Sequence, residues 1–193
     1  MNKTFFISDT HFGHASLVAK GERRFNDITE MDERIIENWN AVVSDNDLVW
    51  HLGDFAVSND ADRIAEIFRR LKGRKRLILG NHDYDRPGVI KPMVAALSWD
   101  EEPRDIIETV AIGDRRLVLC HYPLRTWPGH KKGSYHFYGH AHGGLADFGN
   151  SRDVGVDLPD VSFTPRTFAK LIERLSSAEV GILETQSVAQ VSP

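Results

Sequence analysis

The sequence predicts a mixed α/β (α+β) fold, and two observations carry that prediction. Short apolar, β-rich runs recur along the chain and each stops at a polar cluster: residues 4–11, 48–54, 76–83, 116–121 and 135–142. Helical patterns separate the first three runs, which favours parallel pairing between them. Residues 106–120 instead place a Gly113-Asp114 turn between two apolar runs, the pattern of an antiparallel hairpin. A sheet system with both kinds of pairing follows.

The two helices between the first three runs each carry boundary signals. In the first, Thr29 and Asp32 resemble a capping box, and apolar residues recur at helical spacing after them. In the second, Ser58 is the expected cap and Gly73 the expected stop, on either side of an apolar stripe. These helices are the crossovers that parallel strands need.

A last helix is expected at residues 164–177, with Thr164 as its cap and Pro165 at its first position. The residues after it carry little pattern, and the last dozen are expected to form a tail. We find no internal repeat, low-complexity tract or linker that divides the sequence. Residues 1–193 are therefore expected to form a single domain.

Composition narrows the class of protein. Of the 193 residues, 41% are hydrophobic and 27% charged, which is ordinary for a globular chain and excludes disordered and fibrous classes. The formal net charge of −4 disfavours a large nucleic-acid footprint, although a local basic patch is compatible with it. The single cysteine, Cys120, suits a reducing compartment. The apolar run at residues 5–7 is too short for a signal or a membrane span, so we expect a cytoplasmic protein.

Polar residues that can bind metal follow all five β-rich runs. Ligands of open α/β sheets sit beyond the carboxyl ends of the strands. These side chains are therefore expected to meet in one crevice: Asp9, His11, Asp54, Asn81, His82, Asp83, His121, His140 and His142. Two carboxylates about 4 Å apart repel by about 4 kcal/mol at an effective dielectric near 20, and a cation would remove that cost.

His140 and His142 stand two positions apart at the end of an apolar run. In a strand, such residues point to the same side, so both rings are expected to face one locus.

The donor types narrow the metal. Carboxylate, amide oxygen and imidazole together suit Mn, Fe or Zn, with Co and Ni as further options, and no cysteine pair is present for a structural zinc site. There are more donors than one tetrahedral ion can use. Two divalent ions that share one carboxylate would use them all.

Five short motifs carry a family resemblance when they are taken in order. They are Asp-x-His at Asp9 to His11, Gly-Asp at Gly53 and Asp54, Gly-Asn-His-Asp at Gly80 to Asp83, His121 after an apolar strand, and Gly-His-x-His at Gly139 to His142. Over roughly residues 1–160, the sequence resembles the calcineurin-like metallophosphoesterase family. The resemblance implies two mixed β-sheets in a sandwich flanked by helices, a four-layer α/β/β/α arrangement.

The resemblance also implies which residues hold which ion. Asp9, His11 and His142 would bind one ion, Asn81, His121 and His140 the other, and Asp54 would bridge the two. His82 would be a catalytic histidine near the scissile phosphate, with Asp83 as its orienting partner.

The implied activity is that of a dinuclear metal-dependent phosphoesterase. It would hydrolyse a phosphomonoester or phosphodiester by attack of a metal-bound hydroxide. The expected substrate is a small-molecule phosphoester or a nucleotide-like compound.

Other residues allow more than one interpretation. His14 either touches substrate or caps the next helix, and Arg125 either binds a substrate phosphate or belongs to a surface loop. Trp127 either stacks on a base or lies in that same loop, which we favour. Segment 69–76 contains six basic residues. We interpret them as the solvated end of a helix and favour this over a nucleic-acid-binding patch.

Three further residues and one segment receive no chemical role. His51, His136 and Cys120 are expected to be packed in the interior. The segment 150–157 only partly matches the closing pattern of the family, and no function is assigned to it.

Two alternatives to a small-molecule hydrolase stay open. The first is a non-catalytic binding scaffold on the same fold, which the complete set of ligand positions disfavours. The second is a nuclease, which would need a basic channel leading to the metals.

Overall fold

A computed structural model describes residues 2–104 and 108–175 of the chain. The elements, in order, are β1 (Thr4–Ile7), α1 (Ala15–Ala19), α2 (Ile28–Val42), β2 (Leu48–His51), α3 (Ala61–Arg70), β3 (Arg74–Leu77), η1 (Asn81–Asp83), β4 (Tyr84–Arg86), β5 (Val89–Ile90), α4 (Pro92–Ala95), β6 (Glu108–Ile112), β7 (Arg115–Leu119), η2 (His130–Lys132), β8 (Tyr135–Tyr138), β9 (Ser151–Asp153), β10 (Arg166–Thr167) and α5 (Phe168–Leu175). The expected tail lies outside the described residues, as do the first residues of the expected hairpin. No helix in the described ranges is both long and apolar enough to cross a membrane.

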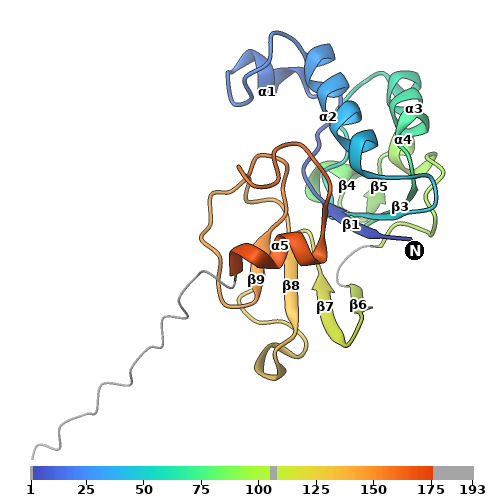
Figure 1. The fold of residues 1–193 in the computed structure, drawn as a ribbon. Helices are drawn as coiled ribbons and strands as arrows, with labels where there is room; N and C mark the ends of the chain where they lie inside the picture. The colour runs from blue at the N-terminus through green and yellow to red at the C-terminus, as the bar shows by residue number, and fades with distance from the viewer. Residues whose placement is uncertain (1, 105–107, 176–193) are drawn as a thin grey trace, which may run out of the picture.

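Two four-stranded sheets form the centre of the fold, and both are mixed, as predicted (Figure 1). The first has the order β10-β1-β2-β3, with β1, β2 and β3 parallel and β10 antiparallel. The second has the order β6-β7-β8-β9, in which the predicted hairpin supplies the antiparallel pair β6 and β7. Strands β7, β8 and β9 are parallel.

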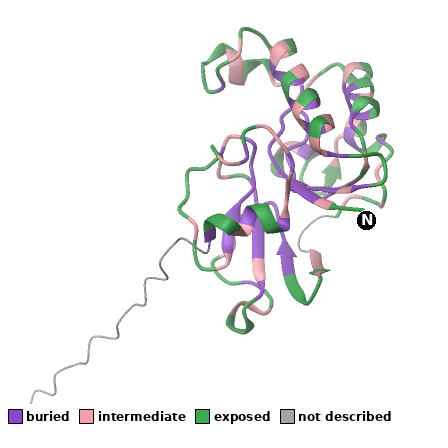
Figure 2. Cartoon of the chain, in the orientation of Figure 1, coloured by how far each residue is buried: buried purple, intermediate pink, exposed green. Residues whose placement is uncertain are grey.

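The first sheet is buried on both faces, because helices cover one face and the second sheet covers the other. Phe5 and Ile7 of β1 belong to the core beneath α2 and α3. Phe6 points the opposite way and meets Phe137 of β8 edge-on, with ring centroids 5.3 Å apart. Strands covered on both sides read as continuous apolar runs, which explains the pattern at residues 5–7. Figure 2 shows the burial concentrated along these strands.

Strand β8 of the second sheet packs against a helix on one face and against a loop on the other. Phe168 of α5 packs on Tyr135 and Phe137, on the face of β8 that also meets the first sheet. On the opposite face, His136 accepts a hydrogen bond from the backbone NH of Leu124 and contacts the ring of Trp127. In the described part of the chain, the loop after β7 therefore covers this face.

Both predicted crossover helices are present, but each is capped by a different residue. Asp27 caps α2 by accepting a hydrogen bond from the NH of Glu30, and Asp60 caps α3 by accepting one from the NH of Arg63. An N-cap has extended backbone and stands directly before the first helical residue, which Thr29 and Ser58 do not. Asp32, expected in a capping box, instead binds Arg63 in the interior.

The last helix begins at Phe168, four residues after the expected cap Thr164. Arg166 and Thr167 pair with Phe6 and Phe5 of β1 as the short strand β10. Pairing with the edge of the first sheet outweighs the local start signal of Pro165.

Two buried neutral histidines make the fold sensitive to acid. Burial lowers the pKa of His51 to about 3 and that of His136 to about 4. Their ordinary pKa is near 6.5, so only the unfolded chain takes up these protons as the pH falls below that value. Stability is lost from about pH 6.5 down to about pH 4 for His136 and down to about pH 3 for His51. We predict that the free energy of unfolding falls by about 2 kcal/mol for each ring between pH 7 and pH 5.

Urea unfolding at the two pH values measures this loss, and nitrogen chemical shifts report the charge on each ring. Substitution of His136 by Gln should remove about half of the loss that the two rings cause. A folded-state titration of either ring near pH 6.5 would contradict the prediction.

Candidate metal centre

The predicted ligands all lie in loops that follow strand ends and face one another across the two sheets. Asp9 and His11 follow β1, Asp54 follows β2, Asn81 follows β3, His121 follows β7, and His140 and His142 follow β8. The convergence expected from the sequence is therefore present in the structure, with contributions from both sheets.

Backbone conformation aims these side chains. Seven described non-glycine residues have a positive φ, and five of them are predicted ligands: Asp9, His11, Asp54, His140 and His142. A left-handed conformation in a non-glycine residue costs about 1–3 kcal/mol and persists only where the surroundings impose it. Such concentration of strain in one place is typical of a functional site.

The glycines that precede the ligands allow the loops to approach one another. A Cβ on Gly80 would lie 2.6 Å from the backbone nitrogen of Asp54, and one on Gly139 would lie 2.6 Å from Oδ2 of Asp9. Both separations are far below van der Waals contact, so no side chain fits at either position. This is the physical reason for the Gly-Asn and Gly-His motifs.

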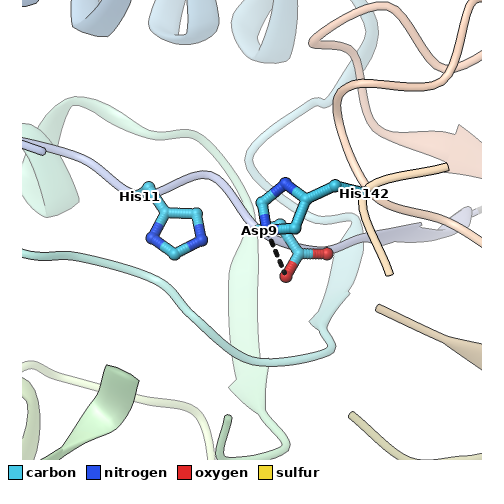
Figure 3. A group of neighbouring side chains, drawn as sticks. All are labelled: Asp9, His11 and His142. Carbon is cyan, nitrogen blue, oxygen red and sulfur yellow. Dashed lines mark ion pairs between the residues drawn. The ribbon is translucent and has the colours of Figure 1, made fainter. Parts of the chain in front are cut away.

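The first group of donors consists of Asp9, His11 and His142 (Figure 3). One ligand atom from each lies within 4.8 Å of the others. Nε2 of His142 is 3.9 Å from Oδ1 of Asp9, and the rings of His11 and His142 are stacked at 5.3 Å. Asp9 is fully buried, whereas His142 is exposed, so this group opens to solvent on one side.

The second group consists of Asp54, His121 and His140, again with ligand atoms within 4.8 Å of one another. The amide oxygen of Asn81 lies 3.2 Å from Nε2 of His121 and 2.9 Å from Nδ1 of His140. Four residues from four loops therefore surround one point.

Asp54 stands between the two groups. Its Oδ2 is 3.6 Å from Nε2 of His11 and 3.5 Å from Nε2 of His121. Its other oxygen accepts a hydrogen bond of 2.7 Å from the backbone NH of His82. A carboxylate in this position can contact an ion on either side.

The spacing of His140 and His142 suggested that both lie on one face of a strand. In the structure they do not. Strand β8 ends at Tyr138, and the positive φ values of 67° and 48° turn the two histidines apart. His140 joins the second group and His142 the first. The pair therefore spans the centre.

The donor set fits divalent metal. Nε2 of His11 is buried and has no hydrogen-bond partner among the described residues, although it points toward Oδ2 of Asp54. A buried nitrogen without a partner is costly unless a ligand occupies it. Imidazole, carboxylate and amide oxygen suit Mn, Fe and Zn.

The protein environment raises some ligand pKa values and lowers others. Burial raises the pKa of Asp9 to about 7, although His121 and His142 oppose the shift. Burial also raises the pKa of Asp54, but its hydrogen bond and charge interaction with His121 outweigh this effect and bring the pKa below its ordinary value. Burial lowers the pKa of His121, whereas Asp54 raises it, to about 9. Buried groups of this kind need a cation or shared protons to balance their charge.

His82 lies beside the first group, while Asp83 has a different position from the predicted one. The ring of His82 is 5.0 Å from that of His11. Asp83 is fully buried and does not face this ring, because its oxygens accept backbone NH bonds from Asp54, Phe55 and Gly80 at 2.8–3.0 Å. Asp83 therefore fixes the loop that carries Asp54, and the expectation that it orients His82 is not met.

Of the two predicted substrate contacts, His14 lies beside the centre and Arg125 does not. His14 lines a cavity of about 500 Å³ together with His11, His82 and His142, and it makes no side-chain cap bond to α1. Arg125 is exposed and is not among the residues that line either cavity beside the centre.

Trp127 is not a surface residue, because only 5% of it is exposed and its Nε1 donates to the carbonyl of Ser134. This burial excludes the stacking role considered for it. His51, His136 and Cys120 are buried, as expected.

Sequence analysis missed one residue pair at the centre. Asp157, in the segment that received no role, accepts a 2.7 Å hydrogen bond from Nδ1 of His142. The buried Arg23 forms a two-pronged ion pair with Asp157 and also donates to the carbonyl of Asp9 at 2.6 Å. The Gly-x-Asp pattern at Gly155 to Asp157 was the available signal, but its partners lie 15 and 134 residues away.

Comparison with known proteins identifies the class of this fold and site. The family model described as calcineurin-like phosphoesterase matches residues 3–164. The chain therefore belongs to the calcineurin-like phosphoesterase family.

Two relatives match different shares of this chain. An uncharacterised protein of Methanocaldococcus jannaschii is 44% identical over 84 residues, which are 43% of this chain and 48% of that protein. The gene 66 protein of Mycobacterium phage D29 is 29% identical over 182 residues, which cover 82% of this chain and 88% of that one. The match thus spans about half of the archaeal relative and most of the phage protein.

A solved structure supports the fold. A protein of unknown function from Aquifex aeolicus superimposes with a TM-score of 0.68 at 25% identity, over 91% of this chain and 100% of that one.

Asp157 offers a test of the first group of donors. Its carboxylate holds the ring of His142 by the nitrogen that faces away from Asp9, and loss of such a partner typically costs 10–100-fold in metal affinity. We predict that Asp157→Asn weakens the binding of one manganese ion by about tenfold and leaves the second ion unaffected. Titration with manganese, followed by calorimetry, measures both sites.

Asp160→Asn is the matched control, because Asp160 pairs with Arg152 and Arg174 away from the centre. Equal metal binding by the wild type and Asp157→Asn would contradict the positioning role.

Proposed function

We propose that this protein is a dinuclear metal-dependent phosphoesterase that hydrolyses a phosphomonoester or phosphodiester. The position of the Asp54 carboxylate carries the proposal, because one oxygen lies 3.6 Å from a nitrogen of the first group and 3.5 Å from a nitrogen of the second. Membership of the calcineurin-like phosphoesterase family supports the reaction class.

The ligand sets follow from the two groups. Asp9, His11 and His142 would hold one ion, and Asn81, His121 and His140 the other, with Asp54 shared. When bound, two such ions supply an activated water near neutral pH and neutralise charge on the phosphoryl group. Asp83 keeps the loop after β3 in register with the loop after β2, because its carboxylate accepts hydrogen bonds from the backbone NH groups of Asp54 and Phe55.

His82 is the residue in position to assist the reacting phosphate. Its backbone NH donates a hydrogen bond to Asp54, which fixes the backbone beside the centre. Its ring lies 5.0 Å from that of His11 and lines the cavity of about 500 Å³ with His14. In its protonated form, the ring can donate a hydrogen bond to a phosphate oxygen or a proton to the leaving oxygen. A positioned acid of this kind contributes about 10²–10⁴-fold to the rate.

Metal dependence is the first test of the function. We predict that the chelated protein is inactive toward bis(p-nitrophenyl) phosphate and p-nitrophenyl phosphate, and that manganese restores cleavage with two ions bound per chain. Elemental analysis gives the ion count, and release of p-nitrophenol gives the rate. Two bound ions without cleavage of a broad panel of esters would instead support the binding scaffold.

Substitution of His82 separates catalysis from metal binding. We predict that His82→Ala lowers kcat by about 100-fold or more while the manganese content stays at the wild-type level. His130→Ala is the matched control, since His130 packs on Trp127 away from the centre. An unchanged kcat in His82→Ala would remove His82 from the mechanism.

The nuclease alternative receives no support from the basic segment 69–76. This segment precedes and enters β3 from its amino end, whereas the metal ligands follow the carboxyl ends of the strands. Arg70 pairs with Glu33, Arg74 and Arg76 pair with Asp100, and Lys75 is buried. A small-molecule phosphoester therefore remains the proposed substrate, and the cytoplasmic location remains a prediction from the sequence.

A further inference from the structure

Two cavities flank the metal centre, and their walls differ in chemistry. The cavity beside the first group has a volume of about 500 Å³ and polar walls that include His14, Lys20 and Glu22. The cavity beside the second group has a volume of about 520 Å³ and begins at Asn81 and His121. A phosphate at the centre would have one substituent near each cavity.

The second cavity has an aromatic wall. Tyr122 follows His121 directly, is 43% exposed, and has its ring centroid 5.0 Å from the rings of both His121 and His140. Tyr84 and Arg86, which belong to β4 and follow Asn81 in the sequence, also line this cavity. Two phenol rings and a planar guanidinium group therefore border a space that opens directly from the proposed metal ligands.

Large exposed aromatic side chains are uncommon among the described residues. Besides Tyr122, only Phe148 is both aromatic and strongly exposed there. An aromatic ring left open beside a catalytic centre is suited to stacking on a planar ligand group, and Arg86 can stack in the same way.

We propose that this cavity binds the nucleobase of a nucleotide-type phosphoester. The inference rests on the phosphoesterase function and deepens it by naming the substrate class. The volume of about 520 Å³ lies in the usual range for a small-molecule site and accommodates a base with its sugar. With the phosphate at Asn81 and His121, the sugar spans the mouth of the cavity and the base reaches Tyr122.

Stacking predicts affinity for a base with little discrimination between bases. Every base has a π-face, and base–aromatic stacking is worth about 1–3 kcal/mol, which corresponds to about 5- to 150-fold in affinity. Leu79 and Pro87 contribute apolar surface to this wall, and any selection between bases would come from the polar side chains that line the same cavity, Asp85 and Arg86.

Adenosine 5′-monophosphate and ribose 5-phosphate form the matched pair of probes, because they differ only in the base. Both are titrated into the manganese-loaded protein by calorimetry. Phosphate release is followed in the same samples, so that KM replaces Kd if a probe is hydrolysed. We expect the nucleotide to bind at least tenfold more tightly than the sugar phosphate. In Tyr122→Ala this advantage should fall to about twofold or less, and Tyr122→Phe should retain it.

Phe148→Ala is the control, because this exposed ring does not line the cavity and its loss should leave the ratio unchanged. Equal affinity for the two probes, or an undiminished ratio in Tyr122→Ala, would overturn the base subsite even if aryl phosphates are hydrolysed. A preference for the nucleotide without hydrolysis of any ester would instead overturn the proposed function and leave the subsite intact.

Discussion

The carboxylate of Asp54 connects both sheets at the point where their strands end. Its two oxygens reach His11 from the loop after β1, His121 from the loop after β7, and the backbone of His82 after β3. Its own backbone NH is held by the buried carboxylate of Asp83. Moving this one residue would therefore disturb four loops and remove the carboxylate that stands between the two groups of candidate donors.

The arrangement is strained, and the strain has a clear origin. Strands pointing toward one edge bring their loops close together, but extended backbone would carry side chains past one another. Left-handed turns at residues such as Asp9 and Asp54 bend the chain so that the donors face inward. The cost of about 1–3 kcal/mol for each turn is offset by the packed layers beneath. Phe6 and Phe137, in contact between the sheets, belong to that support.

The surroundings of the centre explain how one fold can serve different substrates. The candidate donors all follow the ends of strands, whereas the cavities on either side are bordered by loops and by the short β4–β5 hairpin. Tyr122, Arg86 and His14 border these cavities and are not candidate ligands themselves, but Tyr122 contacts the rings of His121 and His140, and His14 contacts that of His11. We therefore expect the donors at the strand ends to determine the class of reaction and the residues that border the cavities to determine the substrate.

The sequence by itself determined the alternation of strands and helices, the mixed pairing and the identity of the candidate ligands, because apolar periodicity and short motifs are local. Tertiary structure decided how those residues are used. His140 and His142 separate because two left-handed turns override the alternation of a strand, and Trp127 is buried because a loop folds onto β8. Asp157 reaches His142 through contacts that no local pattern encodes. Partners that meet only when distant segments fold together cannot be identified from spacing along the chain.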